Sequence, residues 1–133
     1  MKNTQEYIYS FPNTSCTLRV VEHLKNRYKS YLVSVAVVNL IDRWLVRLNL
    51  SKYTSKGRVK NLQAFLNEMG SASVPDNTVM QALRSLDRGE SPTKVMNRYR
   101  VAIVSHGEPE LEEIKIFRDG IIERLGYCPQ TMV

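Results

Sequence analysis

The sequence predicts a mostly α-helical protein: a single compact domain of five or six helices over residues 1–133, with a short strand or extended arm at the N-terminus. Two observations lead to this prediction. Apolar residues recur at three- and four-residue spacing along most of the chain, which is the period of a helix with one buried face. Most of these segments also begin at Ser, Thr, Asp or Asn, and several end at Gly, the residues that start and stop helices.

The N-terminal third is expected to hold an arm and two helices. Residues 1–12 alternate polar and apolar side chains, which indicates a strand or an extended arm. Capping oxygens at 13–15 precede a helix of about 16–29. A second helix is predicted over 37–48 from its apolar spacing, whereas the β-branched run 33–38 also suits the start of a strand.

The rest of the chain is expected to form four more helices, at about 55–70, 76–89, 91–103 and 109–125. The Ser-Pro pair that opens the third of these is favourable, because the serine hydroxyl caps the helix and proline gives up an amide that had no partner. Within the single domain, residues 40–105 would form the helical core and residues 108–126 an acidic C-terminal helix.

Positive charge is concentrated in one part of the sequence. The formal net charge is +6, and ten Lys or Arg residues lie between Arg19 and Lys60 against only Glu22 and Asp42. Residues 108–124 reverse this balance, with six acids against three bases. One region is therefore expected to attract polyanions such as nucleic acid.

Several classes of protein are disfavoured by the sequence. Cys16 and Cys128 form no Cys-x-x-Cys pair and no leader pattern precedes them, which predicts a reduced, cytoplasmic protein. The most apolar run, 31–41, is too short to span a membrane. His23 and His106 lack partners at metal-ligand spacing, and no phosphate loop or nucleophile motif is present. We therefore expect no metal, no cofactor and no enzymatic activity.

Four segments together resemble a known DNA-binding domain. They are Leu-Ile-Asp-Arg-Trp-Leu at 40–45, the basic segment 53–70, the short segment 78–86, and Gly-Glu-Ser-Pro-Thr-Lys-Val-Met-Asn-Arg-Tyr-Arg-Val-Ala-Ile at 89–103. This order resembles the helical core-binding domain of tyrosine recombinases and phage integrases over about half of the chain. The resemblance implies a module that clamps one face of duplex DNA. The catalytic domain of that family has no counterpart here, so strand cleavage is not expected.

The resemblance also implies which side chains meet duplex DNA. On the first helix of the clamp they are Thr54, Lys56, Arg58 and Lys60, and on the second they are Ser91, Thr93, Lys94, Asn97 and Arg98. Lys and Arg would mostly position the phosphate backbone, whereas Asn97 and Arg98 carry groups that can read bases. The expected function is a non-catalytic DNA-binding protein, an accessory or regulatory factor of a mobile element.

Two other functions remain open from the sequence. A helix-turn-helix regulator would use 62–70 and 76–86, and in its winged form 99–105 and 111–117 would pair as a β-hairpin instead of forming helices. The second of these functions is that of a small phage- or plasmid-encoded inhibitor that binds a host complex. Its partner surface, or a homodimer seam, would be the apolar side of the C-terminal helix: Leu111, Ile114, Phe117 and Ile121.

Overall fold

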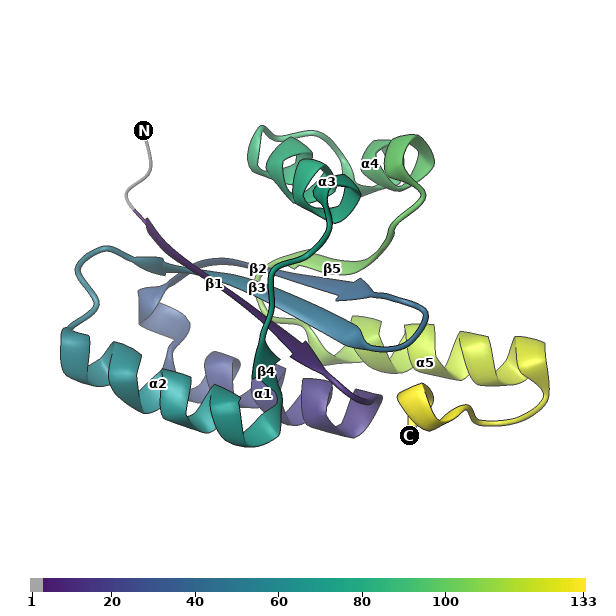
Figure 1. The fold of residues 1–133 in the computed structure, drawn as a ribbon, viewed down its shortest axis with the longest axis horizontal. Coiled ribbons are helices and arrows are strands. Elements are labelled where there is room, and N and C mark those ends of the chain that lie inside the picture. Colours follow the sequence, from purple (N-terminus) through teal and green to yellow (C-terminus); the bar gives the residue numbers. More distant parts are fainter. Residues whose placement is uncertain (1–3) are drawn as a thin grey trace.

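The structure is a computed structural model that describes residues 4–133. It is an α/β fold, so the prediction of a mostly α-helical domain is wrong. A five-stranded antiparallel sheet lies between two layers of helices, with α1, α2 and α5 on one face and α3 and α4 on the other (Figure 1). The strands are β1 (Thr4–Phe11), β2 (Leu32–Asn39), β3 (Trp44–Ser51), β4 (Ser71–Ala72) and β5 (Ala102–Gly107). The helices are α1 (Thr14–Arg27), α2 (Lys56–Met69), α3 (Asn77–Asp87), α4 (Pro92–Tyr99) and α5 (Leu111–Leu125), with 3-10 turns η1 (Lys29–Tyr31) and η2 (Gln130–Met132).

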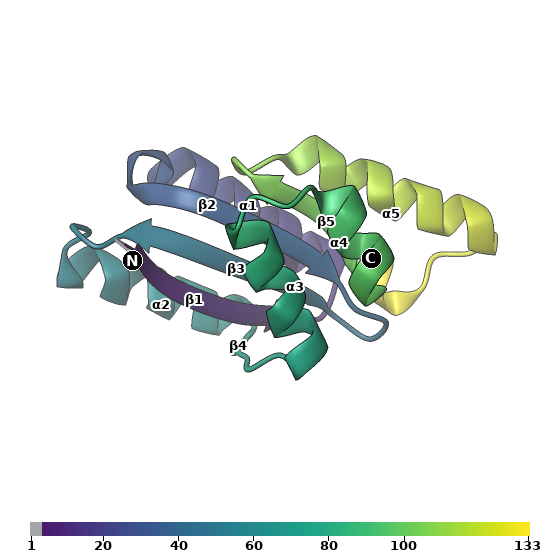
Figure 2. The ribbon, with the colours of Figure 1, turned by 90° about the horizontal axis from the view of Figure 1, so that it is seen from above.

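The strand order is β4-β1-β3-β2-β5, so the central strand β3 is flanked by β1 and β2 (Figure 2). The predicted N-terminal arm is a full strand that pairs with β3 from Thr4 to Phe11, although its first residues, 1–3, lie outside the described part of the chain.

Gly70, which follows the last residue of α2, lies directly against β1. A Cβ at this position would be 2.1 Å from the Ser10 carbonyl oxygen, so only glycine lets the chain pass there.

The helix predicted over 37–48 is instead the hairpin of β2 and β3. Both faces of this hairpin are covered, with Trp44 and Val46 in one core and Leu45 in the other. When both faces of a strand are buried, nearly every position is apolar and the alternation that marks a strand disappears. The turn at 40–43, Leu-Ile-Asp-Arg, also lacks the Asn-Gly or Asp-Gly signal of tight hairpins.

The helix predicted over 91–103 ends early. Arg100 adopts a left-handed conformation with φ of 58°, which stops α4, and the chain continues as edge strand β5. β5 pairs with β2 and not with 111–117, which belongs to α5, so the winged hairpin is also wrong. The predicted helical core of 40–105 therefore contains strands and contributes to both helical layers.

The remaining helices agree with their predicted starts. The side chains of Asn13, Ser55 and Asp76 each accept a hydrogen bond from a backbone amide in the first turn of α1, α2 and α3. These local caps depend only on neighbouring residues, which is why the sequence alone could locate them.

Two separate cores hold the layers to the sheet. The larger core lies between the sheet and α1, α2 and α5, and the smaller one lies under α3 and α4. The predicted dimer seam faces the larger core: Ile114 is fully buried, and Leu111, Phe117 and Ile121 pack beside it. Within residues 4–133, the helices lack the length and apolar composition needed to cross a membrane.

Candidate nucleic-acid interface

The residues predicted to contact DNA lie on opposite faces of the sheet. α2 belongs to one helical layer and α4 to the other (Figure 1). On the α2 side, Lys56, Arg58 and Lys60 are exposed, but Thr54 is 6% exposed and cannot reach a ligand. On the α4 side the whole predicted set is exposed: Ser91, Thr93, Lys94, Asn97 and Arg98. Because the sheet separates them, the two sets cannot grip one duplex between them.

Two arginines on the α4 side, Arg88 and Arg98, are already engaged within the protein. Arg98 pairs with Glu90 at 2.5 Å and lies over the ring of Tyr99, 5.6 Å from its centroid. Arg88 also reaches Glu90, at 3.6 Å. The pKa of Glu90 is lowered, chiefly by Arg98. The hydroxyl of Ser91 accepts a hydrogen bond from the backbone amide of Lys94 and so caps the start of α4. Arg98, predicted to read bases, is therefore committed to an intramolecular pair.

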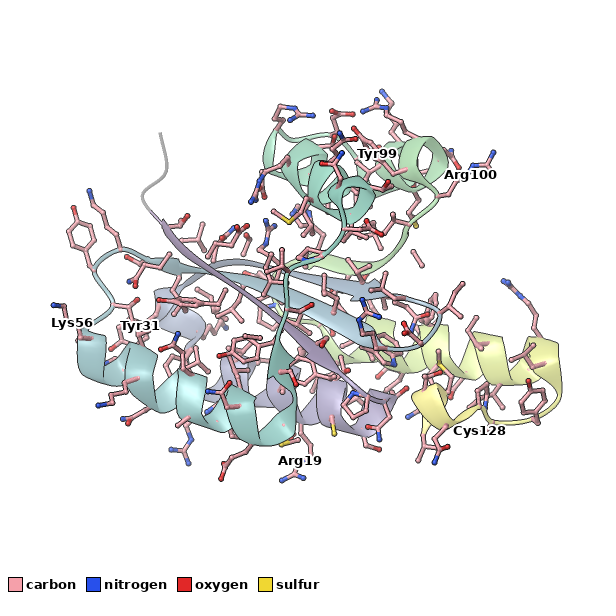
Figure 3. All side chains as sticks on the ribbon, in the orientation of Figure 1. Arg19, Tyr31, Lys56, Tyr99, Arg100 and Cys128 are labelled. Carbon is pink, nitrogen blue, oxygen red and sulfur yellow. The ribbon has the colours of Figure 1, made fainter. Side chains whose placement is uncertain are left out.

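Exposed cations gather instead on α1, η1, the loop before α2, and α2, which together we call the basic layer. They are Arg19, Lys25, Arg27, Lys29, Lys52, Lys56, Arg58 and Lys60. The acids exposed on these helices are Glu22 and Glu68. Arg19 on α1 and Lys56 at the start of α2 both extend away from the sheet (Figure 3). The basic layer therefore presents a surface of one dominant sign.

The cations of the basic layer differ from Arg84, Arg88 and Arg98 on the α3–α4 side, each of which has an acidic partner. Among residues 4–133, no ion pair includes any of the eight side chains of the basic layer. The charge of a cation that has no acidic partner within the protein is not neutralised, so it can attract an anionic ligand. On binding, such cations would displace the counterions condensed on the phosphates of a nucleic acid, and the release of these counterions is a large part of the affinity.

Contacts between α1, η1 and α2 hold the basic layer in a set arrangement. The guanidinium of Arg58 lies over the ring of Tyr31, 4.7 Å from its centroid, and the Tyr28 hydroxyl donates to the Arg58 carbonyl at 3.2 Å. These contacts join the end of α1 to the start of α2. The spacing between cations on the two helices is therefore fixed before any ligand arrives.

A shallow groove of about 210 Å³ runs between α1 and α2 within the basic layer. It is lined by Arg19, Glu22, His23, Asn26, Arg27 and Phe65. The His23 ring is stacked on the Phe65 ring, with centroids 3.9 Å apart. Burial lowers the pKa of His23 from its ordinary value, and the nearby Arg27 lowers it further. The imidazole is therefore neutral at pH 7.

The sequence-based site omitted the α1 half of this surface. Arg19, Lys25 and Arg27 carried a signal, because they contribute to the basic excess before Lys60, but the resemblance directed attention to α2 and α4. In the sequence, His23 was weighed as a metal ligand, for which it lacks partners at the required spacing. Its stacking on Phe65 joins residues 42 positions apart on different helices. Local sequence cannot report such a contact.

A second polar cluster lies between the sheet and α3. Arg47 on β3 is 0% exposed, and its Nη1 is 3.2 Å from Glu6 Oε2 while its Nη2 is 2.9 Å from Asp87 Oδ1. Arg84 on α3 completes the cluster, with Nη1 2.6 Å from the same oxygen of Glu6. A hydrogen bond from Arg84, helped by Arg47, lowers the pKa of Glu6 to about 2.

This Arg47 cluster has the properties of a structural anchor. Its two guanidinium groups are balanced by two carboxylates, and Glu6 keeps its negative charge throughout the neutral range. A general acid or base needs a pKa near the working pH, and Glu6 is displaced in the opposite direction. The cluster therefore ties α3 to β1 and β3.

Comparison with known proteins supports the fold and nothing more specific. No protein-family model matches the chain, and no curated protein matches it. A solved structure described as the crystal structure of the C-terminal domain of YpbH is similar, with a TM-score of 0.50 and 16% sequence identity. The match covers 85% of this chain and 98% of that one. At this identity the likeness concerns the arrangement of helices and strands alone.

Proposed function

We propose that this protein binds nucleic acid without catalysing a reaction on it, and that the basic layer contacts the phosphate backbone. The observation that carries the proposal is the set of exposed Lys and Arg side chains of the basic layer, which form no ion pair within residues 4–133. The clamp implied by recombinases is not part of the proposal, because its all-helical fold is absent here. The proposal keeps Lys56, Arg58 and Lys60 from that site and adds the cations of α1.

The test is a binding titration of labelled DNA by fluorescence anisotropy at about 50 mM and 200 mM salt. Binding through several phosphates should weaken steeply between these concentrations, since each contact contributes about 0.9 to the slope of log affinity against log salt. Absence of binding at the lower salt, or binding that salt leaves unchanged, would contradict the proposal.

A protein partner is the second candidate function, favoured by apolar side chains exposed near the β2–β3 turn. Ile41 is 100% exposed at this turn, and Val74 is 94% exposed in the connection that leads to α3. A cleft of about 460 Å³ opens beside the turn, with Leu40, Val79 and Val101 among its lining residues. Contact through such a surface would depend on apolar burial and change little with salt. Replacing Ile41 by Ser should weaken the binding of this protein partner and leave DNA binding unchanged.

A further inference from the structure

The groove between α1 and α2 has the shape and composition of a base-binding site within a phosphate-binding surface. It opens to solvent on the basic layer, and its lining includes His23 and Phe65, whose rings are stacked on each other. The planes of these rings differ by only 17°, and Tyr28 lies beside His23 at 5.7 Å. The platform is therefore already ordered, so that a planar ligand could extend the stack at little entropic cost.

Cations flank this platform on both sides along α1. Arg19 and Arg27 are one helical turn before and after His23, or about 6 Å along the axis in each direction. Both line the groove. A base stacked at His23 would therefore place the phosphates on its two sides close to guanidinium groups. Such alternation of cations with a stacking ring is how proteins bind single strands.

The remaining polar groups of the groove suit a base edge better than a simple anion. The Asn26 amide offers both donor and acceptor groups, and the Glu22 carboxylate accepts from exocyclic amines. A carboxylate would repel a free phosphate placed in the groove. The lowered pKa of His23 keeps its ring uncharged, which is compatible with stacking on a neutral base.

The geometry points to single-stranded nucleic acid as the ligand of the basic layer, with one unpaired base held in the groove at His23. In a duplex the bases are stacked on one another and paired, so their faces are not available to stack on His23. The inference rests on the proposed nucleic-acid binding and specifies its substrate. Tight binding of a duplex was the earlier expectation from sequence.

The experiment compares a fluorescein-labelled DNA strand of about 20 nucleotides with its duplex, by anisotropy, at the two salt concentrations given above. Wild-type protein should bind the single strand about tenfold more tightly than the duplex, since one stacked base contributes a factor of this order. His23→Ala should remove that preference without changing duplex affinity. The unchanged duplex affinity shows that His23→Ala is folded. His23→Phe should keep the preference, because phenylalanine leaves a neutral ring stacked on Phe65.

Lys94→Gln on α4 is the matched control, expected to bind both ligands as the wild type does. Equal affinity for strand and duplex, or an unchanged preference in His23→Ala, would overturn the single-strand inference while leaving salt-dependent binding in place. Failure of both ligands to bind in a salt-dependent manner would instead overturn the proposed function itself.

Discussion

The two faces of the sheet are held to their helices by different means. The face under α1, α2 and α5 is joined by an extended apolar core, in which Trp44 packs edge-on against Phe117 with centroids 5.7 Å apart. The face under α3 and α4 has a smaller apolar core beside the Arg47 cluster. Apolar burial stabilises the first layer, whereas the second also needs a buried charge to be matched by its partners.

This difference extends to the outer surfaces and explains where an anionic ligand would bind. On the α3–α4 side, acids such as Glu90 and Asp87 lie close enough to neutralise the arginines. The basic layer carries only Glu22 and Glu68 as exposed acids, and within residues 4–133 neither forms an ion pair with its cations. The Lys and Arg residues of the two surfaces therefore have different consequences, because ion pairing decides how much positive charge each surface presents to a polyanion.

The largest effect is expected on the apolar side, from Trp44→Ala. The Trp44 side chain is fully buried, and its indole N–H donates to the Thr131 carbonyl at 2.8 Å. Loss of this packing should lower the free energy of unfolding by about 4 kcal/mol, which a denaturant titration would measure. Phe65→Ala should cost less, because Phe65 is only partly buried. A Trp44→Ala variant with the wild-type midpoint would show that the larger core does not depend on this residue.

Breaking the Arg47 cluster should lower the free energy of unfolding slightly less than Trp44→Ala does. Arg47→Ala leaves Glu6 and Asp87 without their buried partner, and the expected loss is about 3 kcal/mol by the same denaturant titration. The matched control is Arg43→Ala, since Arg43 pairs with Asp42 at the surface and should contribute less than about 1 kcal/mol. Equal losses in the two variants would mean that the cluster does not anchor α3.

The cluster should also make stability depend on pH. The pKa of Glu6 is about 2 in the folded protein against 4.5 for the free side chain, so the folded state binds fewer protons. Its stabilising contribution is present above pH 4.5 and is lost as the pH falls toward 2. Denaturant midpoints measured across this range should fall less steeply in Glu6→Gln than in the wild type. Parallel curves for the two proteins would exclude a role for Glu6.

The smallest expected change in free energy is in DNA binding, when charges are removed from one outer surface or the other. Arg19→Gln with Lys60→Gln removes two charges from the basic layer and should lower the salt slope of DNA binding by about two units. Lys94→Gln with Arg98→Gln removes the same charge from the α4 side and should leave the slope unchanged. The reverse outcome would place the ligand on α4, which is one of the two helices that the resemblance to recombinases implies.

Sequence reasoning located most helices of the outer layers but missed the sheet between them. α1, α2, α3 and α5 have one solvent-facing side, so their apolar periodicity is visible and their caps are local. β2 and β3 are covered on both faces, and their continuous apolar run imitates a buried helix. The first two residues of β5, Ala102 and Ile103, were assigned to the helix of α4 because their spacing from Val95 and Tyr99 also suits a helix.

The amino-acid sequence by itself determined the helix boundaries set by local caps and the excess of cations between Arg19 and Lys60. Only the tertiary structure decided that α2 and α4 lie on opposite faces, that Arg98 is paired and Arg19 is not, and that His23 meets Phe65. Caps and charge counts depend on near neighbours along the chain. Pairing and stacking depend on which distant segments the sheet brings together, and the sheet forms through contacts that no local pattern records.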